Sequence, residues 1–264
     1  MVKLFANLFW IHTPGVFQKV FSKIFSRFFE LRISRMIILP YLMFFGLNSD
    51  YLDQFESDDN ESKYSSYSEF FNRKLKRKLV VDSSTIWPCE GYVCDWGTFQ
   101  EKNNSMVKGQ KMNLNVIFQS NPESTKDYFF TNIFLHNHNY HRVHAPVDGI
   151  VTGILRIPGD LVFLRPWFFN RADVSYPAIR NERVVFEITD SSQSVWYMAL
   201  VGGFGVGTIE ISKHINMGST VGVGEEVARF NLGSTVCLAT PQKIKVQNYL
   251  QTVRVGQNLE QENI

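Results

Sequence analysis

The chain has 264 residues, 44% of them hydrophobic and 20% charged, a length that suits one sizeable domain or one domain with a terminal extension. Its net charge of +2 gives no overall attraction to nucleic acid, so we expect no nucleic-acid partner. Three cysteines, an odd number, exclude a disulfide framework. We expect them to be small buried side chains of a protein from a reducing compartment.

Residues 16–36 predict an amphipathic helix. Apolar side chains recur in adjacent pairs every four positions, and Lys19, Lys23 and Arg27 form a ridge beside them. One interpretation is a helix in a membrane interface, with aromatic rings in the lipid and bases at anionic headgroups. The other is a helix packed on its own domain with a solvated basic rim. The next apolar run, residues 36–45, favours the membrane, but ten residues interrupted by Pro40 are too few to span it.

The middle of the chain changes character twice. Residues 49–66 are acidic and polar, which indicates an exposed linker. Residues 66–79 predict a short helix that Ser66 or Ser68 can cap. Its base cluster NRKLKRK is interpreted as a solvated face, with headgroup contact as the alternative.

From about residue 86, short β-branched and aromatic runs alternate with Gly, Pro and Asn, which is typical of β-sheet. The strands expected are YVCDWGTF, GIVTGILRI, RVVFEI, VWYMALVGGFGVGTIEI, TVCLAT and KIKV. We therefore predict an α+β fold, with N-terminal amphipathic helices in residues 1–64, acidic linker included, and a compact, mainly antiparallel β domain in residues 65–264.

Two patterns in the β region suggest chemistry. The segment HNHNYHRVHAP contains His136, His138, His141 and His144. Histidine is the commonest metal ligand, but no suitable cysteine or carboxylate spacing accompanies these four, so a general acid or base role is the stronger interpretation. The string GSTV occurs twice and offers a hydroxyl at Ser219 and at Ser234, with no hydrolase elbow or phosphate-binding loop around either.

The order of the motifs is more specific than any one of them. The chain contains, in sequence, YSSYSEFFNRKL, WPCEG, VKGQ, YHRVHAPVDGIV, IPGDLVFLRP, RNERVVFEI and VGVGEEVARFNLGSTV. From about residue 65 to residue 240 this series resembles the phosphatidylserine decarboxylase family, and the helical N-terminus resembles it more loosely.

The resemblance implies a self-processing enzyme. The proenzyme would cut itself between Gly233 and Ser234, and Ser234 would become a covalent pyruvoyl group, with no metal and no pyridoxal phosphate. A glycine before the serine suits the attack, because it has no Cβ and tolerates strained backbone angles. The products would be residues 1–233 and 234–264, and the pyruvoyl carbonyl would withdraw electrons while the substrate loses CO₂.

The site residues are carried over from the family's motifs. His144 matches the base of self-processing, and His141 matches the proton donor in decarboxylation. Glu90 of WPCEG stands where the family has an aspartate, and we predict that it orients His144. Glutamate has a pKa similar to that of aspartate. Because its side chain is one methylene longer, the carboxylate has to be repositioned, and we expect this to affect the rate of self-processing.

The expected activity is decarboxylation of phosphatidylserine to phosphatidylethanolamine and CO₂. The alternatives are decarboxylation of a free amino acid on the same scaffold, or an unprocessed, inactive lipid-binding homologue because of Glu90. The resemblance also implies a homodimer of processed heterodimers. We expect peripheral or monotopic membrane association, on the cytoplasmic face of a bacterial membrane or on the mitochondrial inner membrane of a eukaryote.

Overall fold

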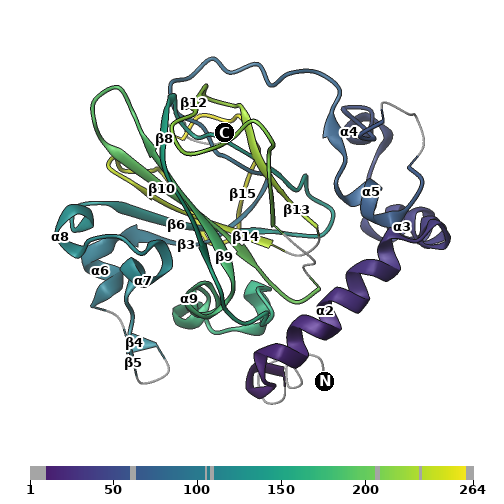
Figure 1. The fold of residues 1–264 in the computed structure, drawn as a ribbon, viewed down its shortest axis with the longest axis horizontal. Coiled ribbons are helices and arrows are strands. Elements are labelled where there is room, and N and C mark those ends of the chain that lie inside the picture. The colour runs from purple at the N-terminus through teal and green to yellow at the C-terminus, as the bar shows by residue number, and fades with distance from the viewer. Residues whose placement is uncertain are drawn as a thin grey trace.

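N-terminal helices lie beside a domain built on β-sheets, as Figure 1 shows. This computed structural model describes residues 10–59, 64–104, 106–107, 110–205, 209–231 and 234–259. The predicted α+β architecture with a mainly antiparallel sheet is confirmed.

Eight strands form the main sheet, and every pair of neighbours in it is antiparallel. Across the sheet the order is β12 (Thr220–Val221), β8 (Gly149–Ile157), β9 (Arg183–Thr189), β10 (Val195–Gly202), β14 (Ser234–Thr240), β6 (Phe129–Leu135), β3 (Gly91–Thr98) and β15 (Gln251–Val253). The central strand β14 is buried along its whole length, so it alternates between two cores. Val236 and Leu238 face one core, and Cys237 and Ala239 face the other.

A second sheet and a group of short helices cover the two faces of the main sheet. The three-stranded sheet β11 (Ile209–Ile211), β13 (Glu226–Phe230) and β7 (Arg142–His144) encloses the first core, to which Val143 and Phe230 contribute. Helices α6 (Phe99–Asn103), α7 (Leu114–Phe118) and α9 (Tyr176–Arg180) enclose the second. The remaining short elements are α8 (Pro122–Thr125), β4 (Met106–Val107), β5 (Gln110–Lys111), and the 3₁₀ turns η4 (Pro166–Phe168) and η5 (Arg171–Asp173).

The N-terminal region consists of η2 (Trp10–His12), α2 (Gly15–Glu30), η3 (Arg32–Ile37), α3 (Ile38–Phe45) and α4 (Ser49–Leu52). The prediction of one continuous helix over residues 16–36 is therefore wrong at its end. Leu31 is extended, and the hydroxyl of Ser34 donates to the carbonyl of Phe29 at 2.7 Å and accepts from the backbone N–H of Tyr67 at 2.9 Å. A serine that bonds the backbone in this way competes with the helical pattern.

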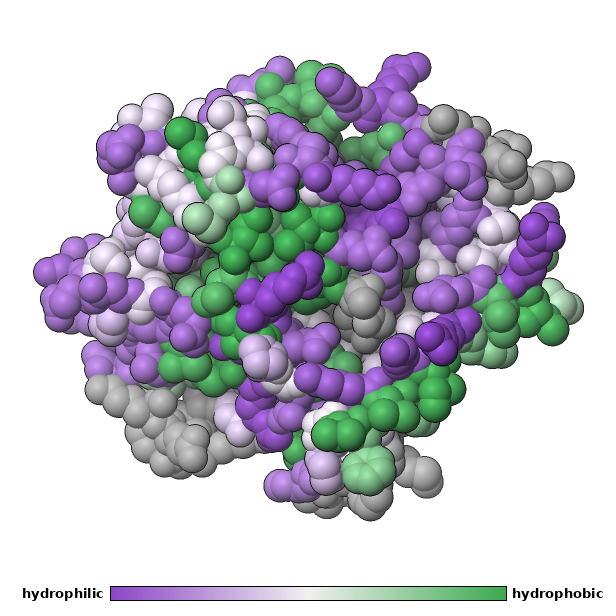
Figure 2. All heavy atoms as spheres, viewed as in Figure 1, coloured by the Kyte–Doolittle hydropathy of each residue, from purple (hydrophilic) through white to green (hydrophobic). Residues whose placement is uncertain are grey.

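Helix α2 buries polar side chains against the β domain and leaves much of its apolar side exposed. Gln18, Ser22 and Ser26 are buried, whereas Phe17 and Ile24 are 67% and 66% exposed. The side-chain oxygen of Gln18 accepts from the backbone N–H of Leu161 at 2.7 Å, and the Ser22 hydroxyl accepts from that of Gly205 at 3.2 Å. In Figure 2, hydrophobic residues follow the line of α2 at the lower right. The helix thus packs on the domain through this polar strip and through the rings of Phe21, Phe25 and Phe29 beside it, while the rest of its apolar side is exposed.

The helix predicted for residues 66–79 is much shorter. Helix α5 covers Tyr67–Phe71 and is capped by Ser66, whose hydroxyl accepts from the backbone N–H of Glu69 at 3.2 Å. The chain then forms β2 (Lys74–Leu75), which pairs with β1 (Phe55–Glu56). The interpretation of the base cluster as a solvated face fails for Arg73, which is fully buried.

Most predicted strands are present, but the run at residues 195–211 divides into β10 and β11, which belong to different sheets. Residues 243–246 form no strand, although Ile244 is buried in the first core. Alternating hydrophobicity indicates which side chains are buried, but it does not show whether the backbone pairs with a neighbouring strand. Here the side chain of Ile244 is buried, while the backbone of residues 243–246 forms no strand pairing. All three cysteines are free and buried, as predicted.

Candidate active site

Ser234 opens the central strand β14. It lies opposite Gly202 of β10 and Leu135 of β6, so strands on both sides hold its backbone. Its side chain is completely buried, and its hydroxyl has no hydrogen-bond partner within the described parts of the chain. Because a buried hydroxyl without a partner is costly, such a group in a native protein needs an explanation, and chemistry is one. Gly233, the predicted cleavage partner, lies outside the described residues.

A small cavity of about 160 Å³ adjoins Ser234. Side chains of α2, α5, β6 and the loop after β8 form its walls, and most of them are aromatic or aliphatic. The polar side chains among them, besides Ser234 and the Tyr67 hydroxyl, are Asn137 and Arg165. The full lining is Phe25, Phe29, Tyr67, Phe134, Asn137, Phe163, Leu164, Arg165, Gly203, Phe204, Gly205 and Ser234.

His141 ends the loop between β6 and β7 and is fully buried. Its Nδ1–H donates to the carbonyl of Asn139 at 2.8 Å, which leaves Nε2 as the nitrogen with the free lone pair. This Nε2 is buried and has no hydrogen-bond partner in the residues that the structure describes. Burial, together with the positive charge of Arg73, holds the pKa of His141 well below its ordinary value, so the ring is neutral. The ring packs on Phe71 of α5, with 3.8 Å between centroids.

His144, the last residue of β7, has both ring nitrogens engaged. Nδ1 donates to the carbonyl of Gly224 at 2.7 Å, and Nε2 accepts from the hydroxyl of Tyr140 at 3.1 Å. Burial lowers its pKa. The ring borders a second, larger cleft together with Tyr140, Gly224 and the bases of residues 74–78, and it does not line the Ser234 cavity.

The carboxylate of Glu90 does not orient His144 as predicted. Its Oε1 accepts from the hydroxyl of Tyr51 at 2.9 Å and from the side-chain amide of Asn139 at 2.7 Å. The WPCEG and YHRVH motifs are nevertheless joined through the backbone, since the N–H of His144 donates to the carbonyl of Pro88 at 2.8 Å. The Tyr140 hydroxyl and the Gly224 carbonyl, however, already satisfy the two ring nitrogens of His144.

Asn139 instead connects Glu90 to the other histidine. Its side chain donates to Glu90, and its carbonyl accepts from Nδ1 of His141. Arg73 donates to the same carbonyl at 3.1 Å and to the hydroxyl of Tyr51 at 3.2 Å, so the buried network contains one cation and one carboxylate. No sequence motif pointed to Asn139, Arg73 or Tyr51 as part of the site. Asn139 lies inside the histidine motif, which was the available signal, whereas Tyr51 and Arg73 are contributed by elements far from it.

The other two histidines of the motif form a pair at the edge of the helical region. The rings of His136 and His138 lie 4.3 Å apart and contact Phe45 of α3. Burial and the neighbouring His138 lower the pKa of His136 to about 4. In the described part of the chain, no group of three or more His, Cys, Asp or Glu side chains could hold a metal ion.

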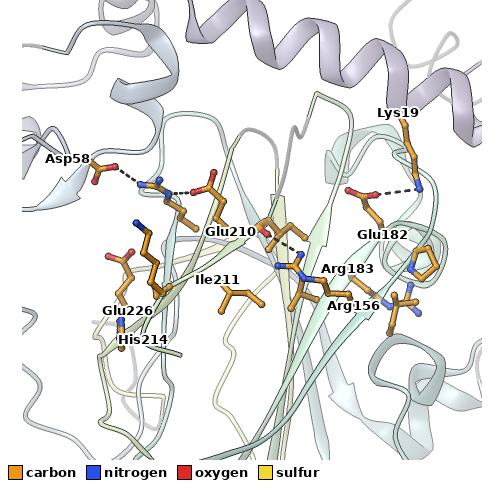
Figure 3. A pocket seen from close by; sticks show the side chains of 16 residues that line it. Lys19, Asp58, Arg156, Glu182, Arg183, Glu210, Ile211, His214 and Glu226 are labelled. Carbon is orange, nitrogen blue, oxygen red and sulfur yellow. Dashed lines mark hydrogen bonds and ion pairs between the residues drawn. The ribbon is translucent and has the colours of Figure 1, made fainter. Parts of the chain in front are cut away.

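A much larger cleft, of about 1130 Å³, lies between α2 and the β domain and is lined largely by charged residues (Figure 3). Figure 3 shows Lys19 of α2 directed toward Glu182, and the two charged groups lie 3.6 Å apart. Arg229 pairs with both Asp58 and Glu210. Most of these charges already have partners in the chain, and Ser234 does not line this cleft. His141 and Glu90 line neither this cleft nor the Ser234 cavity. We therefore interpret this cleft as the contact between the helical region and the β domain, and the smaller cavity as the reactive site.

The two serines of the repeated GSTV differ completely in their surroundings. The hydroxyl of Ser219 accepts from the backbone N–H of Asn216 at 3.0 Å and donates to the carbonyl of His214 at 3.3 Å in an exposed turn. Ser234 is buried and unpartnered at a cavity. This contrast separates a turn residue from a reactive candidate.

Known proteins resemble this chain over most of its length. The family model described as "Phosphatidylserine decarboxylase" matches residues 67–261. A protein named phosphatidylserine decarboxylase proenzyme from Pseudoalteromonas translucida is 31% identical, over 72% of this chain and 76% of the relative. Its namesake from Bacillus thuringiensis subsp. konkukian is also 31% identical, over 80% and 79%.

The chain belongs to the phosphatidylserine decarboxylase family.

The match to this family begins at the first residue of α5 and includes Glu90, His141, His144 and Ser234. Helices α2 and α3 lie outside it. Membership confirms the prediction of an enzyme, because the family consists of carboxy-lyases. At about 30% identity, the substrate and the individual residue roles still have to be argued from the site.

Proposed function

We propose that this protein cleaves itself between Gly233 and Ser234 and then decarboxylates phosphatidylserine to phosphatidylethanolamine and CO₂. The observation that carries the proposal is the hydroxyl of Ser234, which is buried and unpartnered at the start of β14 and borders an apolar cavity. The cavity suits a lipid headgroup, and its aromatic walls continue into α2.

In the proposed maturation, Oγ of Ser234 attacks the carbonyl carbon of Gly233 and the peptide bond becomes an ester. Loss of the Cα proton of Ser234 then breaks its Cβ–Oγ bond, and residues 1–233 leave as a carboxylate. Water replaces the nitrogen of the remaining dehydroalanine, which releases ammonia and leaves the pyruvoyl group. Bound there, this group supplies a carbonyl that withdraws electrons from the substrate as CO₂ departs.

The chain's own residues would move the protons. We assign the base of maturation to His144, which must release the Tyr140 hydroxyl before its Nε2 can accept a proton from Ser234. We assign reprotonation of the product carbon to His141, whose Nε2 has no competing partner among the described residues. Glu90 would act on His141 through Asn139, as a positioning residue.

Two measurements test the function. The mass spectrum of the purified protein should contain a 31-residue C-terminal fragment with a blocked N-terminus, and CO₂ should be released from phosphatidylserine vesicles but not from free serine or aromatic amino acids. A single intact 264-residue species would favour the inactive homologue instead. Cleavage with release from a free amino acid alone would favour the other alternative.

We propose that the exposed face of α2 and α3 lies in the membrane interface, at the cytoplasmic face of a bacterial membrane or at the mitochondrial inner membrane. Met43 and Phe44 of α3 are 75% and 81% exposed, and Phe17 and Ile24 of α2 are exposed to a similar extent. Exposed apolar side chains gathered on neighbouring helices indicate a binding surface. Within the described residues, no helix is long and apolar enough to span the bilayer. The homodimer stays a prediction.

Replacing Phe17 and Ile24 together by Asp should weaken binding to anionic vesicles at least about 10-fold, because each apolar side chain contributes on the order of 1 kcal/mol or more when it enters lipid. Vesicle co-sedimentation measures this. The matched control is Met217→Asp, a similar change at a 73% exposed residue in the turn before β12. Equal binding by all three proteins would rule out this face as the membrane contact.

A further inference from the structure

Arg165 differs from the other arginines around the site. It is half-buried and lines the same cavity as Ser234. Arg142, Arg180 and Arg229 each pair with a carboxylate, at Glu226, Asp160 and Glu210 respectively. Arg165 has neither a carboxylate nor a hydrogen-bond acceptor among the residues that the structure describes, and its guanidinium lies 5.8 Å from the ring centre of Trp167.

A guanidinium in such a place carries an unbalanced positive charge. Arginine keeps its charge under all ordinary conditions, and a partly desolvated charge without a counter-ion is costly. The walls around it are mostly apolar, with Phe163, Leu164 and Phe204 among them, and no acidic side chain lines the cavity within the described residues. An arrangement of this kind favours an anion that enters the cavity from outside.

We propose that Arg165 binds the phosphodiester group of the lipid headgroup while the headgroup amine is held at Ser234. This inference deepens the proposed function and rests on it for the identity of the lipid. The planar guanidinium can donate two parallel hydrogen bonds to phosphate oxygens. Phe25 lines the cavity and also belongs to the exposed face of α2, so the acyl chains have an apolar route toward the membrane.

The substrate also carries a carboxylate, but chemistry argues against that partner. The carboxylate loses its negative charge as CO₂ forms, so a cation there would stabilise the ground state more than the transition state and would slow the reaction. The phosphodiester keeps its charge throughout. Arg165 can therefore bind it equally in both states, which strengthens substrate binding without raising the barrier.

The test compares Arg165→Gln with Arg171→Gln in the full-length, self-cleaved protein. The Arg171→Gln substitution removes the same charge from the same loop between β8 and α9. Arg171, unlike Arg165, is exposed, and its guanidinium lies over the rings of Trp96 and Tyr249. The probe is dihexanoyl phosphatidylethanolamine below its micelle concentration, which has the phosphate and lacks the carboxylate. We expect Arg165→Gln to weaken its binding, measured by calorimetry, about 10- to 100-fold, and Arg171→Gln to leave it unchanged.

Arg165→Lys keeps the charge and should lose less affinity, which also covers the case in which the Gln variant fails to fold. The KM for phosphatidylserine should rise in parallel with the loss of affinity, with a smaller change in kcat and complete self-cleavage. Unchanged binding of phosphatidylethanolamine in Arg165→Gln would overturn the inference, even if phosphatidylserine bound less tightly. Arg165-dependent binding without CO₂ release from the unsubstituted protein would contradict the proposed function and leave the phosphate site standing.

Discussion

Ser234→Ala is expected to leave the chain as a single uncut 264-residue species that releases no CO₂. Alanine has no oxygen to attack the preceding carbonyl, and without cleavage no carbonyl group forms at this position. The variant should also fold as well as the original, because the hydroxyl it loses is buried and makes no hydrogen bond with the described residues. Intact mass, thermal melting and a CO₂ assay on phosphatidylserine vesicles measure the three parts of this result.

Ser219→Ala is the matched control, since the same three letters GST surround both serines. Its hydroxyl joins a turn through two backbone hydrogen bonds, so this change should cost a little stability and leave cleavage complete. Cleavage of Ser234→Ala, or failure of Ser219→Ala to cleave while folded, would contradict the assignment of the reactive serine.

The second large effect concerns the two histidines, whose substitutions should separate maturation from catalysis. His144→Gln is expected to remain uncut, because it removes the proposed base. His141→Gln is expected to cleave but to lose about 10²- to 10⁴-fold in the rate of CO₂ release, which is the usual contribution of a positioned acid or base. Single-turnover CO₂ release and the mass spectrum distinguish the two steps.

His214→Gln serves as the control for both, because this exposed histidine pairs with Glu225 away from the Ser234 cavity. The structure also gives a meaning to the reverse result, in which His141→Gln stays uncut and His144→Gln is cut. His141 has the neutral ring and the free Nε2, so an uncut His141→Gln together with a cut His144→Gln would exchange the two roles. In that case Glu90 would support maturation through Asn139 rather than decarboxylation.

Sequence patterns predicted well wherever a local rule decides the outcome. The strand GIVTGILRI is strand β8, and Ser66 caps α5 as its position before an apolar run suggests. The same local rule distinguishes the surroundings of the two serines, since an apolar strand begins at Ser234 and a turn surrounds Ser219.

Patterns could not predict which partner a side chain meets. The periodicity of α2 marked an apolar face but not its direction, whereas the structure shows Gln18 and Ser22 buried and accepting hydrogen bonds from backbone N–H groups of the β domain. Arg73 lies in a run of bases yet is buried against carbonyls of the histidine loop. Glu90 binds Asn139 because folding brings that loop to it, and motif order contains no information on this choice.

The position of β14 has a consequence for the two-chain protein that cleavage would produce. The 31-residue fragment would contain the central strand of the main sheet, bonded to β10 on one side and to β6 on the other, together with the edge strand β15. The two products would thus remain interlocked, with no further covalent link needed. Once denatured, however, they would have to find each other again, so folding that begins as a unimolecular event would become bimolecular and its yield would depend on concentration. The cleaved protein would therefore stay assembled while it is native, but it would refold with difficulty after denaturation.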